Sequence, residues 1–154
     1  MTRFIRTTLG LAVAAASLFA LAGSNLPADA QVTAAAPDLV PVPSRILQGT
    51  VSVKNAGSAD AGAFVVTAQC QKQGGGGCAE HRGMAAYTDP MYPGRLVVNV
   101  PGLQKGKVFN HKLPFWNDLD WQPGNYNFVI EADAGKTVGE TNEGNNIGGA
   151  VLSK

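Results

Sequence analysis

His81 and His111 are the only histidines of the chain, and they are the first residues to consider for catalysis. A hydrolytic site would pair one of them with a nucleophile and an orienting carboxylate. The sequence has no Gly-x-Ser-x-Gly elbow, and its serines after position 30 lie in turn or strand contexts. We therefore predict that both histidines are ordinary surface residues, with His111 on the solvent side of a strand, and that the protein is not an enzyme.

The carboxylates of Asp118, Asp120 and Glu131 are candidates for a different chemistry. Glycoside cleavage uses two carboxylic acids that flank the scissile bond. Asp118 and Asp120 lie in one short segment beside two tryptophans. The same pattern describes an ordinary solvated turn, and the sequence leaves both interpretations open.

Four aromatic side chains could form a binding surface: Trp116, Trp121, Tyr87 and Tyr92. Aromatic residues with a polar group favour interfaces, and flat pairs of them stack on sugars. The alternative is that both tryptophans close the open end of the folded domain. An exposed, coplanar pair would favour ligand binding, whereas two buried rings would favour the cap.

A polar cluster lies near the C-terminus, and its candidate cation ligands are Asp133, Glu140, Asn142, Glu143 and Asn145. Ca²⁺ requires about six to eight oxygen ligands. The spacing does not match an EF-hand. Asn and Asp side chains also brace their own loops by hydrogen bonds to the backbone. We favour bracing over Ca²⁺, and we expect no cofactor.

Cys70 and Cys78 are the two cysteines, and four consecutive glycines precede the second. Glycine folds back without steric cost, so the two sulfur atoms can meet. A metal pair would need further ligands at suitable spacing. We predict a disulfide that pins a loop.

The N-terminus has the pattern of a secretory signal peptide. Arg3 and Arg6 precede an uncharged apolar run from Leu9 to Leu21, and a small-x-small site ends at Ala30. The run is shorter than the roughly 20 residues of a membrane span. We predict a cleaved signal peptide at 1–30, no membrane span afterwards, and a secreted or periplasmic product in which a disulfide persists.

The charge balance of the mature chain limits its partners. Removal of Arg3, Arg6 and Asp29 from the twelve basic and eleven acidic residues leaves ten of each. A neutral, mixed surface has no electrostatic footprint for nucleic acid. The expected partner is an unknown protein or glycan at the cell envelope.

Alternating apolar and polar residues predict an all-β domain. After a flexible lead-in at 31–37, one domain fills 38–154, with β-branched and aromatic runs broken by Gly, Pro, Asn and Asp. The expected strands are 38–42, 46–55, 63–70, 95–100, 107–113, 125–132 and 147–152. Seven short strands with turns between them indicate an antiparallel β-sandwich. Tyr126 lies where such sandwiches often have a tyrosine corner, and 71–94 is the longest loop.

Several segments together resemble the CARDB family, an Ig-like module of bacterial and archaeal surface and secreted proteins. They are 37–40 (Pro-Asp-Leu-Val), 51–60 (Val-Ser-Val-Lys-Asn-Ala-Gly-Ser-Ala-Asp), 100–106 (Val-Pro-Gly-Leu-Gln-Lys-Gly), 123–133 (Pro-Gly-Asn-Tyr-Asn-Phe-Val-Ile-Glu-Ala-Asp) and 138–147 (Val-Gly-Glu-Thr-Asn-Glu-Gly-Asn-Asn-Ile). The closing Glu-x-Asn-Glu-x-Asn-Asn pattern is the most specific.

The resemblance implies a seven-stranded Ig-like sandwich that serves as a structural or interaction module, linked by the family's name to cell adhesion, with no catalytic residues. The 71–94 region and the loop at 115–121 depart from the family as insertions. Our leading interpretation is an exported module for protein binding or adhesion at the envelope. The alternative is a small carbohydrate- or ligand-binding module that uses Trp116, Trp121 and the 71–94 loop.

Overall fold

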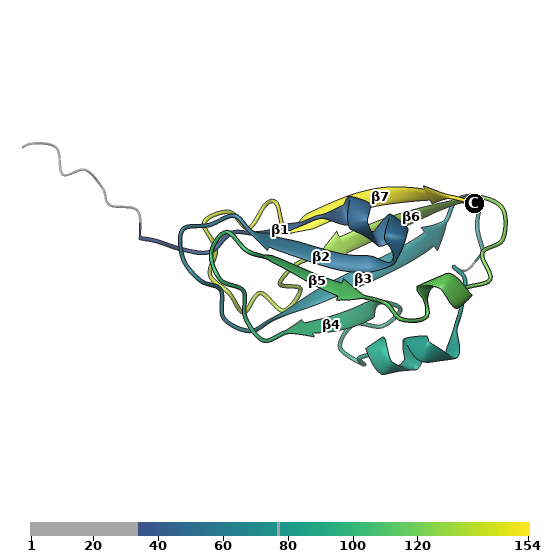
Figure 1. Cartoon of the computed structure of the whole chain (residues 1–154), viewed down its shortest axis with the longest axis horizontal. Coiled ribbons are helices and arrows are strands. Elements are labelled where there is room, and N and C mark those ends of the chain that lie inside the picture. Colours follow the sequence, from purple (N-terminus) through teal and green to yellow (C-terminus); the bar gives the residue numbers. More distant parts are fainter. Residues whose placement is uncertain (1–33, 77) are drawn as a thin grey trace, which may run out of the picture. The chain divides into compact units, whose positions relative to one another are not determined.

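The computed structural model describes residues 34–76 and 78–154, and the predicted signal peptide lies outside them. Strands and short 3-10 helices alternate along this part of the chain (Figure 1). In order they are β1 (Leu39–Pro41), η1 (Pro43–Gln48), β2 (Thr50–Asn55), β3 (Phe64–Lys72), η2 (Arg82–Tyr87), β4 (Leu96–Val100), β5 (Val108–Lys112), η3 (Trp116–Asp118), β6 (Asn125–Glu131) and β7 (Ile147–Ser153). In the described residues, no helix has the length and apolar character needed to span a membrane.

The seven strands form two sheets, with the orders β1-β2-β5 and β4-β3-β6-β7, and the fold is an all-β Ig-like sandwich. Every pairing is antiparallel. β1 and β7 contact each other across one side of the sandwich. β4 and β5 are therefore the edge strands of the opposite side, where Figure 1 shows η2 beside them. This open side is where the 71–94 insertion lies.

The second predicted strand begins four residues later than expected. Residues 43–48 form η1 instead, and β2 starts at Thr50. Pro43 has the fixed φ that suits the first turn of a helix. Gly49 then ends the helix in the left-handed conformation, with φ 72°, and its N–H bonds to the Ile46 carbonyl. An apolar residue at position 46 thus points into the core from a helical turn rather than from a strand.

Alternation along the strands builds the core as expected. Tyr126, Phe128 and Ile130 of β6 are buried, and Val51 and Val53 of β2 face them from the other sheet.

His111 differs from the prediction of a solvent-side residue. Its register partner on β2 is Val51, which is fully buried, so the His111 side chain lies on the inner face of the edge strand β5.

Two anchors hold the ends of the sandwich. The Tyr126 hydroxyl donates to the Gln122 carbonyl at 2.7 Å, which is the hydrogen bond of a tyrosine corner and ties β6 to the tryptophan loop. At the other end, two residues of the expected flexible lead-in accept backbone hydrogen bonds. The Ala36 carbonyl accepts from the Ser58 N–H at 3.0 Å, and the Pro37 carbonyl accepts from the Thr141 N–H at 2.9 Å.

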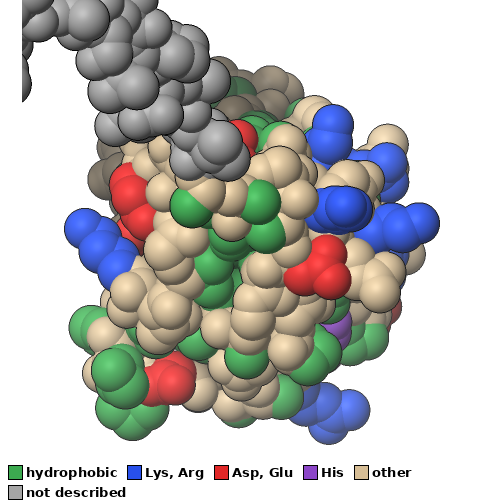
Figure 2. Space-filling model, turned by 90° about the vertical axis from the view of Figure 1, so that its left-hand side faces the viewer, with side chains coloured by type: hydrophobic (Ala, Val, Ile, Leu, Met, Phe, Trp, Pro, Cys, Tyr) green, Lys and Arg blue, Asp and Glu red, His purple; other side chains and the backbone are tan. Residues whose placement is uncertain are grey.

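The surface carries both signs of charge. Figure 2 shows acidic side chains interspersed with other residues on one face, with several lysine and arginine side chains gathered at the upper right and others at the left and lower edges. Within the described residues, one ion pair is present, between Arg95, which directly precedes β4, and Glu131 at the end of β6.

Candidate functional site

A disulfide joins Cys70 to Cys78, as predicted, and it fixes the start of the insertion. Cys70 is near the end of β3, on the same face as the buried Val66 and Ala68. Between the cysteines, Gly74, Gly75 and Gly76 all have positive φ, which side chains rarely adopt. The glycine run therefore lets the chain reverse and places Cys78 beside the sheet that it has just left.

The rest of the insertion is held against the open side by its aromatic residues. His81 caps η2, because its Nδ1 accepts from the Gly83 N–H at 3.0 Å. Its ring stacks on Phe115, with centroids 5.7 Å apart. Tyr87, at the end of η2, packs edge-on against Phe115, and its hydroxyl lies 3.0 Å from His111 Nε2. The inward-facing His111 is thus covered by the insertion.

The two tryptophans are arranged as a cap. Trp116 is 6% exposed and belongs to the core, and the half-buried Trp121 packs against it. Their centroids are 5.1 Å apart, but their planes are tilted by 60°. Trp121 also meets Tyr126 edge-on at 4.8 Å. The pair offers no flat, exposed platform on which a sugar ring could stack.

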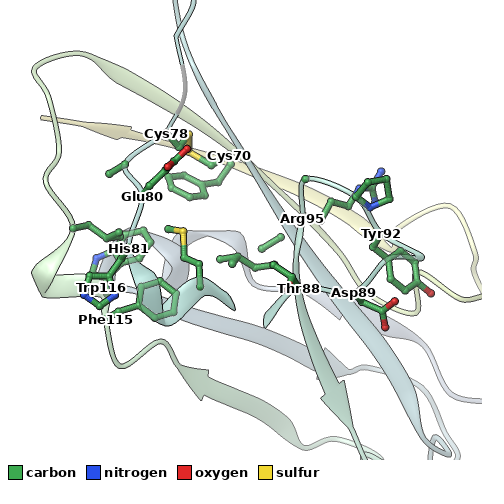
Figure 3. Close-up of a pocket in the computed structure, with 18 of the residues that line it drawn as sticks. Cys70, Cys78, Glu80, His81, Thr88, Asp89, Tyr92, Arg95, Phe115 and Trp116 are labelled. Atoms are coloured by element: carbon green, nitrogen blue, oxygen red, sulfur yellow. A yellow bond between two sulfur atoms is a disulfide. The ribbon is translucent and has the colours of Figure 1, made fainter. Parts of the chain in front are cut away.

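Beneath the insertion lies a cavity of about 660 Å³ (Figure 3). Its floor is the inner face of the larger sheet, with Ala68, Leu96 and Phe128. The tryptophan loop and the insertion supply the walls. They contribute Phe115, Trp116, Leu119, Trp121, Met84 and the Cys70–Cys78 disulfide. The cavity is therefore an extension of the hydrophobic core that the insertion covers.

Few polar side chains reach this cavity. Figure 3 places Glu80 beside the disulfide at one end, and Asp89, Tyr92 and Arg95 at the other end. Arg95 is engaged, because its Nη1 lies 2.5 Å from Glu131 Oε2 and donates to Thr67 Oγ1 at 3.2 Å. The cavity thus combines an apolar body with a few charged groups at its ends, a combination common in ligand sites.

The structure brings together some of the predicted binding residues. Trp116, Trp121 and Tyr92 line the cavity, whereas Tyr87 lies behind Phe115 and does not. Sequence reasoning named the 71–94 loop without singling out Glu80 or Met84, and it missed Leu96, Phe115 and Phe128. Strand alternation identifies Leu96 and Phe128 as inward-facing, but no local signal shows that the space above them is open.

The candidate catalytic residues are not assembled. Among the hydrogen bonds of the described residues, neither histidine contacts a carboxylate or a serine. Glu131 pairs with Arg95, while Asp118 and Asp120 are exposed and do not line the cavity. Asp120 accepts from the Gln122 side chain at 3.2 Å. These acids therefore form no facing pair for glycoside chemistry.

Hydrogen bonds hold the polar C-terminal cluster. The buried Asp133 accepts from the Thr137 N–H at 3.1 Å, the Thr137 hydroxyl at 2.9 Å and the Val138 N–H at 2.8 Å. Val138 is thereby anchored to the core. Further along, the Asn142 Oδ1 accepts from the Gly144 N–H at 3.0 Å, and Asn145 donates to Asp38 at 2.9 Å.

Glu140 joins this cluster to the first strand. Its Oε2 accepts from the Leu39 N–H, and its Oε1 accepts from the Asn146 amide at 2.8 Å. Burial raises the pKa of Glu140 above its ordinary value of 4.5, and the nearby Glu143 and Asp133 carboxylates add to the rise, whereas the bonds from Leu39 and Asn146 lower it.

The oxygens of this cluster are engaged mainly in hydrogen bonds within the domain. The oxygens of Asp133 and Glu140 already accept hydrogen bonds from within the domain. The buried oxygens left unpartnered in the described residues are the neutral Oδ1 atoms of Asn145 and Asn146. Within the described residues, no group of three His, Cys, Asp or Glu side chains is arranged for a metal. The hydrogen bonds of the cluster agree with loop bracing.

The comparisons with known proteins concern the whole domain rather than the cavity. The family model described as CARDB matches residues 28–149. A search of curated proteins gives no match.

Two solved structures are similar to this chain. One is a domain of a protein provisionally assigned to the cell surface of Methanosarcina acetivorans, at 21% identity and a TM-score of 0.50, covering 77% of this chain and 92% of that one. The other is a CARDB domain from Pyrococcus furiosus, crystallised in complex with di-metal ions. It has 21% identity and a TM-score of 0.41, and it covers 79% of this chain and 96% of that one.

Proposed function

The chain belongs to the CARDB family, and we propose that it is an exported, non-catalytic interaction module whose recognition site is the cavity beneath the cystine-pinned insertion. The single observation that carries this proposal is the cavity itself, at about 660 Å³ and lined mainly by apolar side chains. Ligand pockets in proteins measure about 300–1,000 Å³ and have the same composition.

The walls of the cavity indicate an apolar ligand group. Leu96 and Phe128 form its floor, and Phe115 and Trp121 stand at its sides. Each square ångström of apolar surface that a ligand removes from water here stabilises the complex by about 25 cal/mol. A sugar ring would need several hydrogen-bonding groups and a flat aromatic face, and the tilt of Trp116 against Trp121 provides no such face.

We further propose that the domain acts outside the cytoplasm, in the periplasm or the medium, and meets a partner of the cell envelope. The basic and apolar N-terminal segment with its small-x-small site supports export. The disulfide supports it as well, because such bonds persist in oxidising compartments. In this proposal the partner protein or glycan carries, or is delivered with, the apolar group that enters the cavity.

The experiment is to fill the cavity and measure binding of a neutral apolar dye, N-phenyl-1-naphthylamine, by its fluorescence. Ala79 lines the cavity and Ala86 is exposed on the same insertion without lining it. We expect Ala79→Trp to weaken dye binding by about tenfold or more, equivalent to about 1.4 kcal/mol, and Ala86→Trp to leave it unchanged.

The folding of both variants is checked by their melting temperatures. Wild-type protein that does not bind the dye would overturn the proposal. So would an Ala79→Trp variant that binds the dye as tightly as the wild type.

A further inference from the structure

We propose that the cavity selects small apolar ligands that carry a positive charge, that is, amphiphilic amines. This inference rests on the proposed function, and it adds the charge of the ligand, which the apolar lining by itself does not determine. It follows from which charged groups at the cavity are already neutralised and which are not.

No cation of the described residues forms an ion pair with the two carboxylates at the cavity. In the described residues, Glu80 forms neither a hydrogen bond nor an ion pair, and its side chain lies beside the disulfide (Figure 3). At the other end, Asp89 accepts one hydrogen bond, at 2.8 Å, from the Met91 N–H. A ligand in the cavity therefore has a free negative charge at either end.

The positive charge of the cavity is already neutralised. Arg95 is bound by Glu131 at 2.5 Å, so the two charges cancel locally. His81 Nδ1 accepts from the Gly83 N–H at 3.0 Å and is engaged within the insertion. Among the residues that line the cavity, the charge that remains is therefore that of the two carboxylates.

The apolar surroundings strengthen this imbalance. Asp89 is half-buried, whereas Glu80 is exposed. Charges interact more strongly beside low-dielectric walls than in bulk water, so the carboxylates, Asp89 in particular, attract an ammonium group and repel an anion. Aromatic faces also tolerate a cation well: Lys154 Nζ already lies 5.8 Å from the Trp121 ring centroid, and Trp121 and Phe115 both line the cavity. An amine with a short apolar tail satisfies both the apolar walls and the acidic ends.

The experiment measures displacement of the neutral dye at low salt by three ligands with the same tail: octylamine, 1-octanol and octanoate. We expect octylamine to displace the dye at a concentration about tenfold lower than octanoate, with octanol between them. Added salt should reduce the difference between the displacing concentrations of octylamine and octanoate, because salt screens partly exposed charges.

Two double variants test whether the cavity carboxylates cause the preference for octylamine. Glu80→Gln/Asp89→Asn removes the charges of the cavity carboxylates. We expect this variant to need at least about a fivefold higher concentration of octylamine to displace the dye, while octanol displaces it as before. The matched control is Asp118→Asn/Asp120→Asn, which removes the same charge from exposed residues of the tryptophan loop that do not line the cavity. The control should retain the preference for octylamine.

The possible outcomes separate the two proposals. If the dye and all three ligands fail to bind the wild type, the proposed function itself is wrong. If the dye binds and the three ligands displace it equally, the cavity remains the proposed binding site and the proposed charge selectivity is wrong. If the control variant loses the preference as fully as the cavity variant, net charge rather than the cavity carboxylates is the cause, and the inference is overturned.

Discussion

Gly49 holds the tryptophan cap in place through its lack of a side chain. It joins η1 to β2 with φ 72°, and a Cβ atom there would lie 2.1 Å from Trp116 Cγ. Real Cβ atoms do not approach a ring so closely, so Trp116 can lie in the core only because residue 49 is glycine. The wall of the cavity therefore depends on a residue that does not line it.

We predict that Gly49→Ala destabilises the domain much more than Gly106→Ala. Both positions have φ 72°, so both substitutions incur the left-handed strain of about 1–2 kcal/mol, but a Cβ at Gly106 meets nothing within 4 Å. The clash with Trp116 should add about 1–3 kcal/mol. Urea unfolding of both variants measures the difference, and equal losses would contradict this account of the packing.

Glu140 is the residue whose charge should make stability depend on pH. Its pKa is raised in the folded state by burial. The folded protein therefore binds the Glu140 proton more tightly than the unfolded chain does. The resulting contribution to the free energy of unfolding is fully present below the ordinary pKa of 4.5 and is lost as the pH rises through the folded pKa.

We therefore predict that Glu140→Gln changes the pH profile of stability. The free energy of unfolding of the variant, minus that of the wild type, should increase between about pH 4 and pH 7, because only the wild type loses this contribution. Urea unfolding across this range provides the measurement. A difference that stays constant with pH would show that burial of Glu140 does not govern its titration.

At the scale of elements, the insertion covers a side of the sandwich that the two sheets leave open. β4 and β5 are edge strands of different sheets, and η2 packs beside β4 while Tyr87 reaches His111 on β5. The disulfide fixes one end of this cover to β3. Edge strands left bare are liable to pair with other chains, so the cover also protects the sheet edges.

Removal of the disulfide tests how the cover is held. We predict that Cys70→Ala/Cys78→Ala lowers the free energy of unfolding by about 2–3 kcal/mol, the range for a loop this short, and also weakens binding of the apolar dye. Wild-type protein treated with a reductant serves as the control and should behave in the same way. Lost stability with unchanged dye binding would mean that the contacts of η2 suffice to shape the cavity.

At the scale of the whole molecule, the two anchors join segments far apart in the sequence. Glu140 bonds Leu39, and Asn145 bonds Asp38, so the C-terminal cluster holds the first strand against the last connection. At the other end, Tyr126 and the tryptophan cap close the core next to the cavity. The cavity proposed for binding thus lies at one end, and the bracing cluster lies at the other.

Export is the prediction for the chain as a whole. When the full chain is made in a bacterial host, we expect the exported product to begin at Gln31, as measured by intact mass. Ala30→Arg removes the small residue before the predicted cleavage point and should leave the precursor uncleaved. Asp29→Ser, at the unconstrained middle position, is the control and should be processed normally. An exported wild-type product that retains residues 1–30 would contradict the signal peptide.

Much of the architecture follows from local patterns. The alternation of Tyr126, Phe128 and Ile130 predicted a half-buried strand, and their burial confirms it. The glycines between Cys70 and Cys78 predicted the disulfide correctly. In contrast, alternation with neighbouring residues put His111 on the solvent side, and only the pairing register with β2 shows that it faces inward.

By itself, the sequence determined the all-β class, the number of strands, the disulfide and the family, because alternation, turn residues and a glycine-rich connection act over a few neighbouring positions. The tertiary structure alone decided what the aromatic residues do. Trp116 became a buried cap because Gly49 leaves room for it, and the cavity arose because three separate segments meet over Leu96 and Phe128. Such an empty space is a property of packing between distant segments, and no local pattern of residues encodes it.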